Sequence, residues 1–110
     1  MRKIKNFING KSTSYSSNNL EIIDPSKGEQ IGEVVNSNQE DFKKIITSSK
    51  NAFEKWSNIT PLKRSRVLAK FKTNIEKDLD NIASIVSEEH GKTFEDARGS
   101  VIRGLEVVEF

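Results

Sequence analysis

The sequence has no cysteine and only one histidine among its 110 residues. Without cysteine, these residues can form no disulfide and no thiolate metal site, and they supply no cysteine nucleophile. The single histidine, His90, cannot by itself build a histidine-rich metal centre. We therefore expect no metal site and no catalytic residue within this chain.

Long apolar runs and a strong excess of one charge are also missing. Eighteen Lys and Arg stand against sixteen Asp and Glu, which leaves a net charge of +2 and does not call for a nucleic-acid partner. No stretch approaches the roughly 18 apolar residues of a membrane span, and none of signal-peptide length follows the basic N-terminus. We predict a cytoplasmic chain without membrane contact, forming one domain or part of one.

Residues 1–36 carry strand and turn signals. Asn9-Gly10 is the strongest, because both residues tolerate the positive φ angles of a two-residue hairpin. We expect an apolar segment ending at Ile8 to lead into this turn and a strand over 11–15 to return from it. The segments 20–23 and 31–35 form a second predicted pair, and the turn between them contains Pro25 and Gly28.

Residues 37–110 have helical periodicity. Ser37 followed by Glu40 predicts a capping box, Thr60 followed by Pro61 predicts a second helix start, and Gly91 predicts a helix end. A break is expected near 78–80, and a last helix is expected from about Thr93. The apolar stripes of the first and second helical segments are Phe42, Ile45, Ile46, Phe53 and Trp56, then Leu68, Phe71, Ile75, Leu79 and Ile82.

The fold class is therefore α/β, with two short antiparallel strand pairs followed by three to four helices. The last helix is expected to bury Ala97, Val101, Leu105 and Val108. The sequence then stops at 106–110 without a glycine, proline or polar tail to cap the last carbonyl groups, which predicts a truncated polypeptide.

Gly91-Lys92-Thr93 looks at first like part of a phosphate-binding loop. That motif requires a second glycine five positions earlier, where this sequence has Val86. A helix C-cap followed by a loop is the better interpretation. No G-x-G-x-x-G pattern occurs either, so we assign no cofactor-binding residue to this chain.

Two further patterns leave alternatives open. Lys63, Arg66 and Lys70 share a helix face and could contact a phosphate backbone, although no aromatic residue is interleaved for base stacking, so a solvated face is favoured. His90 could act as a general base, but a cap near the helix end is favoured. Exposed apolar residues near the end, Val107, Val108 and Phe110, would instead suit a small helical protein-interaction module.

Arg103 is the most informative single residue, because Gly99 and Gly104 flank it within a predicted helix. Each interior glycine costs a helix about 1 kcal/mol relative to alanine, which suggests a close approach to the backbone there. An arginine at such a place could present its planar guanidinium to a carboxylate. The pattern alone favours the simpler alternative, an ion pair with Glu106 on the same helix.

Several motifs occur in an order that resembles the N-terminal region of the NAD-dependent aldehyde dehydrogenase superfamily. They are Phe7-Ile8-Asn9-Gly10-Lys11, Asp24-Pro25 with Gly28-Glu29, Ala52-Phe53 with Trp56, Arg64 with Leu68, and Glu89-His90-Gly91-Lys92-Thr93. The last segment is similar more specifically to the CoA-acylating methylmalonate-semialdehyde dehydrogenases. It contains Gly91-Lys92-Thr93, Asp96-Ala97, Gly99, Val101 and 103–109.

The resemblance implies an enzyme that oxidises methylmalonate or malonate semialdehyde with NAD and CoA, yielding propionyl-CoA or acetyl-CoA and carbon dioxide. It also implies a homotetramer. In that family a cysteine thiolate attacks the aldehyde and CoA releases the acyl group. The cysteine, the oxyanion asparagine and the dinucleotide-gripping elements are expected beyond Phe110. The chain would then be roughly the first fifth of such an enzyme, inactive alone, with 37–110 forming the helical outer part of a truncated NAD-binding domain.

The resemblance carries one functional residue into this chain. The arginine that grips the substrate carboxylate in the family matches Arg103, which makes substrate binding the favoured role for this residue. Arg98, Ser100 and Ile102 depart from the Glu, Asp and Phe that are frequent in this stretch of the family. These departures leave the arginine in place and affect the expected fit of the substrate.

Overall fold

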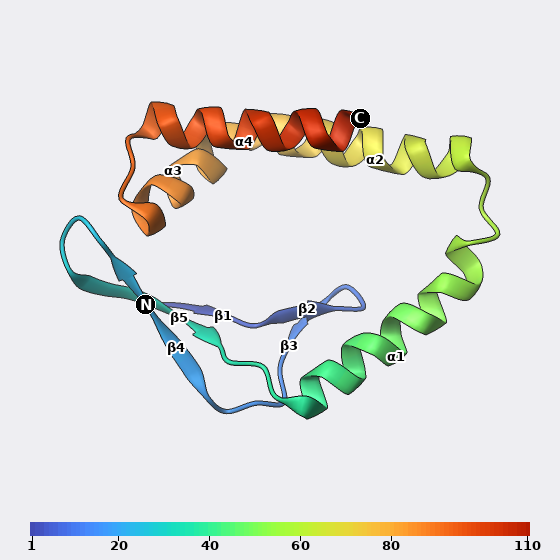
Figure 1. The fold of residues 1–110 in the computed structure, drawn as a ribbon, viewed down its shortest axis with the longest axis horizontal. Coiled ribbons are helices and arrows are strands. Elements are labelled where there is room, and N and C mark those ends of the chain that lie inside the picture. The colour runs from blue at the N-terminus through green and yellow to red at the C-terminus, as the bar shows by residue number, and fades with distance from the viewer. The chain divides into compact units, whose positions relative to one another are not determined.

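The computed structural model describes residues 1–110 as five strands and four helices (Figure 1). Contacts group the chain into two compact units, residues 1–23 with 28–58 and residues 24–27 with 59–110. The predicted α/β class is confirmed. The elements are β1 (Arg2–Ile4), β2 (Asn6–Ile8), β3 (Lys11–Thr13), β4 (Asn19–Asp24), β5 (Glu29–Val35), α1 (Gln39–Trp56), α2 (Pro61–Lys77), α3 (Leu79–His90) and α4 (Phe94–Glu109).

The predicted hairpin at Asn9-Gly10 is confirmed. Strands β2 and β3 pair antiparallel, with Phe7 opposite Ser12. Both turn residues have positive φ, 51° at Asn9 and 74° at Gly10. Two successive positive φ angles define the turn whose twist matches that of the flanking strands, which is why this dipeptide sets the register. Strand β3 ends at Thr13, two residues before the predicted end.

The other sheet contains a strand that the sequence pattern did not indicate. Its order is β1-β5-β4, and β1 runs parallel to β5 with Arg2 opposite Gly32. A Cβ at Gly32 would lie 2.9 Å from the backbone oxygen of Arg2 and 3.2 Å from its Cβ. Because Gly32 has no Cβ, β1 can lie next to β5 at this position without a steric clash.

Helix α1 begins one residue later than expected, so the predicted capping box of Ser37 and Glu40 is wrong by one position. Asn38 is the N-cap, and its side-chain oxygen accepts from the backbone amides of Glu40 and Asp41 at 3.0 Å. Asp41 completes the box by accepting from the Asn38 amide at 3.1 Å. The Ser37 hydroxyl instead bonds the side chain of Asn6.

Asp41 also fixes the segment that follows β3. Its fully buried carboxylate accepts from the backbone amides of Tyr15 at 2.7 Å and Ser16 at 3.1 Å. Together with the Asn38 amide, three backbone donors converge on one side chain. The hydrogen bond from Tyr15 is the main reason that the pKa of Asp41 lies below its ordinary value of 3.8, although burial opposes the shift.

The apolar face of α1 is largely uncovered. Phe42 and Phe53 are 61% and 65% exposed, and Ile46 and Trp56 are also exposed. Val35 is the one buried apolar residue of this unit. The predicted apolar residues do line one face of α1, but few other side chains of this unit cover that face.

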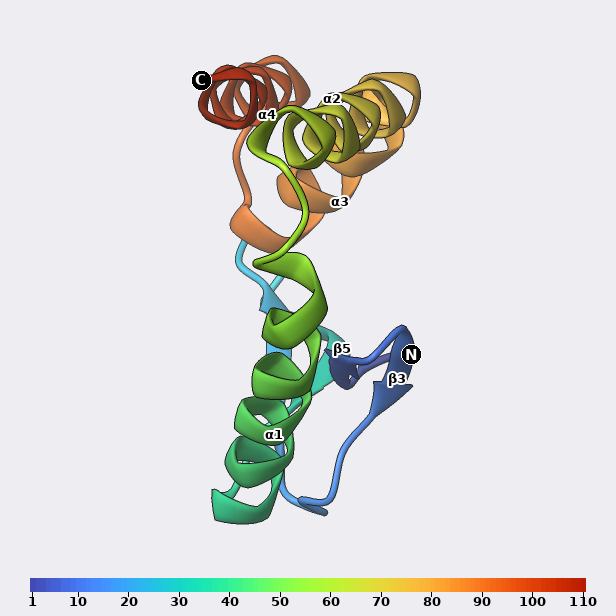
Figure 2. The same ribbon diagram turned by 90° about the vertical axis from the view of Figure 1, so that its right-hand side faces the viewer.

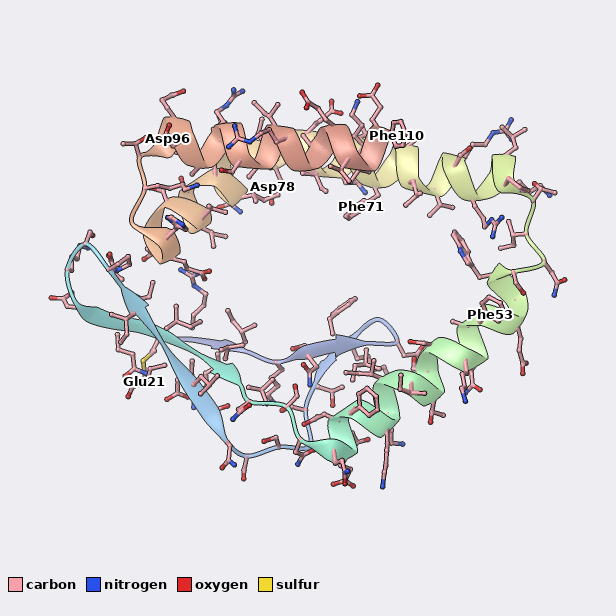
Figure 3. The ribbon with its side chains drawn as sticks, in the orientation of Figure 1. Glu21, Phe53, Phe71, Asp78, Asp96 and Phe110 are labelled. Atoms are coloured by element: carbon pink, nitrogen blue, oxygen red, sulfur yellow. The ribbon has the colours of Figure 1, made fainter.

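The second unit contains α2, α3 and α4, with α4 packed against both other helices (Figure 2). Thr60 caps α2 and Pro61 is its first residue, as predicted. The predicted break falls at Asp78, between α2 and α3 (Figure 3). Gly91 ends α3 with φ 78°, and the Thr93 hydroxyl caps α4 by accepting from the Asp96 amide.

The core of this unit is small. Ala83, Ala97 and Leu105 are its buried apolar residues, while Phe71 on α2 is half exposed (Figure 3). The small side chains at 83 and 97 let α3 and α4 approach closely. No helix combines the length and apolar character needed to cross a bilayer.

Ion pairs on the surface supplement this packing. Arg98 on α4 pairs with Asp80 on α3 at 3.2 Å, and Lys72 on α2 pairs with Glu109 on α4 at 3.1 Å and with Glu76 at 3.5 Å. The hydrogen bond to Glu109 is the main cause that raises the pKa of Lys72. Exposed pairs of this kind add little to stability.

Acid should destabilise both units through Asp41 and Asp24. The Asp24 carboxylate accepts from the Ser26 hydroxyl at 2.6 Å and the Ser26 amide at 2.9 Å, and these bonds hold its pKa below 3.8. Because the unfolded chain protonates first as pH falls, the stabilising contribution of each carboxylate is present above its unfolded-state pKa and is lost as pH falls through its folded-state pKa.

Urea denaturation at several pH values would measure this effect. We expect the contribution of these two carboxylates to stay constant from about pH 7 to about pH 5 and to fall below about pH 4. Asp24→Asn should make the acid-induced loss smaller. An acid-induced loss of the same size in wild type and variant would contradict the assignment to Asp24.

Candidate functional site

Arg103 lies on α4 and is exposed. Its side chain folds back along the helix toward residues one turn earlier. Nη2 donates to the Ser100 hydroxyl at 3.3 Å, and a Cβ added to Gly99 would lie 3.6 Å from Nη1. The guanidinium therefore lies over Gly99 and Ser100. These residues precede Arg103 by four and three positions, so they share its face of the helix.

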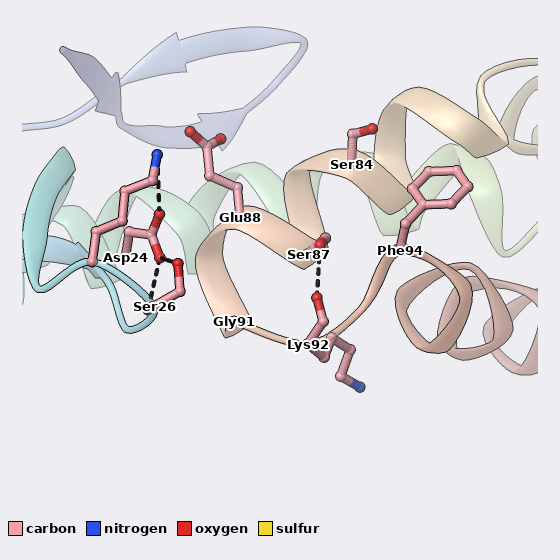
Figure 4. Close-up of a pocket in the computed structure, with 9 residues that line it drawn as sticks. Asp24, Ser26, Ser84, Ser87, Glu88, Gly91, Lys92 and Phe94 are labelled. Atoms are coloured by element: carbon pink, nitrogen blue, oxygen red, sulfur yellow. Dashed lines mark hydrogen bonds and ion pairs between the residues drawn. The ribbon is translucent and has the colours of Figure 1, made fainter.

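The Ser100 hydroxyl is shared by a second cation. Lys92, in the loop before α4, donates from Nζ to Ser100 Oγ at 3.0 Å. Ser100 in turn donates to the backbone oxygen of Asp96 at 3.1 Å. The backbone of Lys92 is held by the Ser87 hydroxyl, which donates to the Lys92 carbonyl at 2.7 Å (Figure 4).

Neither cation has an acidic partner within ion-pair distance in the structure. The ion pair between Arg103 and Glu106, which the sequence pattern alone favoured, is not formed. The guanidinium and the ammonium both point at a neutral oxygen, so this cluster of Lys92, Ser100 and Arg103 carries two uncompensated positive charges. Such a cluster favours binding of an anion.

The two helical glycines behave differently. A Cβ added to Gly99 would meet the guanidinium of Arg103 at an ordinary contact distance, so the expected close approach to the backbone is not found there. At Gly104 an added Cβ would have no other atom within 4 Å, so nothing in the structure requires a glycine there. The substrate-binding role of Arg103 stays a prediction, and the sequence pattern did not indicate that Lys92 and Ser100 lie beside it.

A pocket of about 420 Å³ lies near the C-terminal end of α3 (Figure 4). The turn at 24–27 forms one side of it, and α3 with the start of α4 forms the rest. Arg103 does not line this pocket. Its lining residues are Asp24, Ser26, Lys27, Ser84, Ser87, Glu88, Gly91, Lys92 and Phe94.

Gly91 ends α3 as a left-handed C-cap, which confirms the helix-end interpretation of Gly91-Lys92-Thr93. Its amide donates to the Ser87 carbonyl at 2.9 Å and is therefore already used within the chain. A Cβ at Gly91 would also lie 2.7 Å from Cγ of Pro25. The glycine is required by its backbone conformation and by the turn packed against it.

The remaining candidate residues are exposed on helices. Lys63, Arg66 and Lys70 lie on the surface of α2, and His90 is in the last turn of α3. No three His, Cys, Asp or Glu side chains are grouped so that they could hold a metal ion.

Comparison with known proteins assigns the family. Residues 12–110 match the aldehyde dehydrogenase family, and this chain belongs to that family. Over 110 residues it is 37% identical to the malonate-semialdehyde dehydrogenase of Pseudomonas aeruginosa, a match that covers 100% of this chain and 22% of the relative.

Two further comparisons agree. A Dictyostelium discoideum protein named as a mitochondrial, acylating methylmalonate-semialdehyde/malonate-semialdehyde dehydrogenase is 40% identical over 106 residues, covering 96% of this chain and 20% of the relative. A Sinorhizobium meliloti protein, described as a methylmalonate-semialdehyde dehydrogenase, was solved in complex with NAD. Its structure superposes on this chain with a TM-score of 0.97 at 37% sequence identity, and the match covers 100% of this chain and 23% of the Sinorhizobium chain. This chain thus spans about a fifth of their length, and none of these matches supports nucleic-acid binding.

Proposed function

We propose that this chain is the N-terminal part of an NAD-dependent, CoA-acylating dehydrogenase of methylmalonate or malonate semialdehyde. The products would be propionyl-CoA or acetyl-CoA, carbon dioxide and NADH. The family membership and the similarity to semialdehyde dehydrogenases along the whole chain support this proposal. The observation that supports it is the guanidinium of Arg103, which has no acidic partner and occupies the sequence position at which the resemblance expects the carboxylate-binding arginine.

Arg103 would bind and orient the substrate. Its planar guanidinium can donate two parallel hydrogen bonds to a carboxylate, which fixes the direction in which the aldehyde carbon points. One of its nitrogens donates to the Ser100 hydroxyl at 3.3 Å, which is a long hydrogen bond. A carboxylate is a stronger acceptor than a neutral hydroxyl and would replace or extend that contact.

NAD would accept a hydride and CoA would accept the acyl group, but no residue of this chain is assigned to either. The backbone amide at Gly91 is used by Ser87, and the chain has neither a dinucleotide fingerprint nor a cysteine. The residues present therefore do not form a dinucleotide site by themselves. We propose instead that 37–110 is the helical outer part of the NAD-binding domain, preceded by the strand region 1–36.

Assembly and location are also proposals. A homotetramer follows from the family resemblance. We propose a cytoplasmic location, as for a soluble enzyme of this family, while the name of the Dictyostelium relative places that protein in mitochondria.

The proposal predicts that the 110-residue chain alone forms no NADH from either semialdehyde. A version of the protein extended through the downstream region should form NADH in a CoA-dependent manner, which absorbance at the NADH band measures. Arg103→Met in the extended protein should raise KM for the semialdehyde by at least about tenfold, because a charged hydrogen-bond partner of the carboxylate is lost.

The matched control is Arg66→Met, which removes an exposed arginine from α2 and should leave KM as in wild type. Turnover by the 110 residues alone would contradict the proposal. So would an extended protein whose KM for the semialdehyde is unaffected by Arg103→Met.

A further inference from the structure

Asn9 and Gly10 form the exposed two-residue turn between β2 and β3. The ladder closes with Ile8 opposite Lys11, on the outer side of this turn. The amide of Gly10 makes no hydrogen bond, and a Cβ added to Gly10 would have no other atom within 4 Å. The peptide group between the two turn residues can therefore rotate without losing a bond or meeting a neighbour.

The side chain of Asn9 makes no hydrogen bond either, which sets it apart from other asparagines of the chain. Asn38 caps the first turn of α1, and Asn58 donates from Nδ2 to the Glu54 carbonyl at 2.7 Å. Asn51 lies within α1, where the backbone amide of the following residue is bonded inside the helix. At the hairpin turn, by contrast, an unbonded side-chain amide adjoins an unbonded backbone nitrogen.

These two groups can react with each other. The Gly10 nitrogen gives up its proton and attacks Cγ of Asn9, so that an N–Cγ bond forms and the Cγ–Nδ2 bond breaks. Nδ2 takes up a proton and leaves as ammonia, and a five-membered succinimide ring remains. Water then opens the ring at one of its two carbonyl carbons, which gives aspartate or isoaspartate. The missing Cβ of glycine lets the nitrogen approach Cγ without a steric clash.

We propose that Asn9 is a site of spontaneous deamidation, and that a groove between the hairpin and α1 receives the carboxylate formed there. The groove has a volume of about 510 Å³, and Ile8 and Asn9 form its side on the hairpin, which lies next to α1 (Figure 1). The residues that α1 contributes are Lys44, Thr47, Ser48, Asn51, Ala52 and Lys55.

The groove carries positive charge and no negative charge. Lys44 and Lys55 line it, no acidic residue does, and neither ammonium lies within ion-pair distance of a carboxylate. Lys44 Nζ lies 5.8 Å from the centre of the Tyr15 ring, an interaction that leaves its charge uncompensated. A carboxylate at position 9 would therefore be attracted to two cations without competition from another acid.

The two products differ in their effect on the hairpin. Aspartate keeps the length of the backbone, and its charge ties the turn to α1. Isoaspartate routes the backbone through the former side chain and so adds a carbon to it, which is incompatible with a two-residue turn and loosens the pairing of β2 with β3. Neither product depends on the dehydrogenase reaction.

Incubation of the full chain at mildly alkaline pH, followed by peptide mapping with mass spectrometry, tests the reaction. We expect replacement of NH2 by OH at Asn9 at least about tenfold faster than at Asn51, which lines the same groove but precedes alanine in a helix. Gly10→Ala should slow the reaction at Asn9 about tenfold, because the added methyl group hinders the attack. Equal rates at Asn9 and Asn51 in the wild type would overturn the proposal.

An NMR pH titration of the Asn9→Asp variant tests the groove. The new carboxyl should have a lowered pKa, with an acid dissociation constant about threefold larger than that of an aspartate in an unfolded peptide. Lys44→Met combined with Lys55→Met should abolish this increase. Lys50→Met, an exposed lysine of α1 outside the groove, should preserve it. An ordinary pKa with both groove lysines present, or equal effects of the groove and control variants, would contradict the role of the groove.

Discussion

Replacing Gly91 with alanine is expected to lower the free energy of unfolding of the unit formed by 24–27 and 59–110 by about 3 kcal/mol. The backbone at Gly91 has φ 78°, where a Cβ meets the following carbonyl oxygen. The added Cβ would also lie 2.7 Å from Cγ of Pro25. The proline ring is stiff, so the turn at 24–27 would have to move.

Gly28→Ala is the matched control for the backbone term. Gly28 has nearly the same φ of 71° but no atom within 4 Å of an added Cβ, so we expect a loss of only about 1 kcal/mol. Urea denaturation followed by far-UV circular dichroism measures both variants. Combining Gly91→Ala with Pro25→Ala should recover the excess loss, as in a double-mutant cycle. Equal losses for the two glycine variants would show that the contact with Pro25 contributes nothing.

Replacing Asp41 with asparagine is expected to speed amide hydrogen exchange at Tyr15 and Ser16 by about 100-fold. The buried carboxylate accepts three backbone amides through two oxygens. An asparagine presents one oxygen and one NH2 group, so at least one backbone donor would face another donor. The segment after β3 would then detach from the start of α1, and NMR-detected exchange would report it residue by residue.

Glu40→Gln is the control for charge. It removes one negative charge from the same helix turn, but Glu40 is exposed and its side chain holds neither Tyr15 nor Ser16. Its exchange rates at these two amides should stay within about threefold of wild type. Similar acceleration in both variants would mean that the helix-dipole charge matters and the hydrogen bonds do not.

Local chemistry explains which parts of the fold could be predicted from the sequence. Asn9-Gly10, Thr60-Pro61 and Gly91 each determine the backbone within a few residues, and the structure confirms all three. Strand β1 could not be predicted in this way, because its partner β5 lies about 30 residues away. The N-cap of α1 is Asn38 rather than Ser37 because Asp41, three residues later, also holds the distant Tyr15 segment.

In the candidate site, too, contacts between separate segments could not be predicted from local sequence patterns. Arg103 was selected through the family resemblance, and the residue pattern alone had favoured a pair with Glu106 that the structure does not contain. The contact between Lys92 and Ser100 was not predicted, because Lys92 lies in the loop before α4 and Ser100 lies on the helix itself. Their meeting depends on the left-handed turn at Gly91, which redirects the chain before Thr93 begins the next helix. Spacing within one helix gives no information about such a contact.

The small number of buried apolar side chains has a thermodynamic consequence. Val35, Ala83, Ala97 and Leu105 are the buried apolar residues, whereas Phe42, Phe53 and Phe71 already contact water in the folded chain. The heat capacity of unfolding grows with the apolar area that becomes newly hydrated. The isolated chain should therefore show a smaller heat-capacity increment than its length suggests, a flatter dependence of stability on temperature and a broad melting transition.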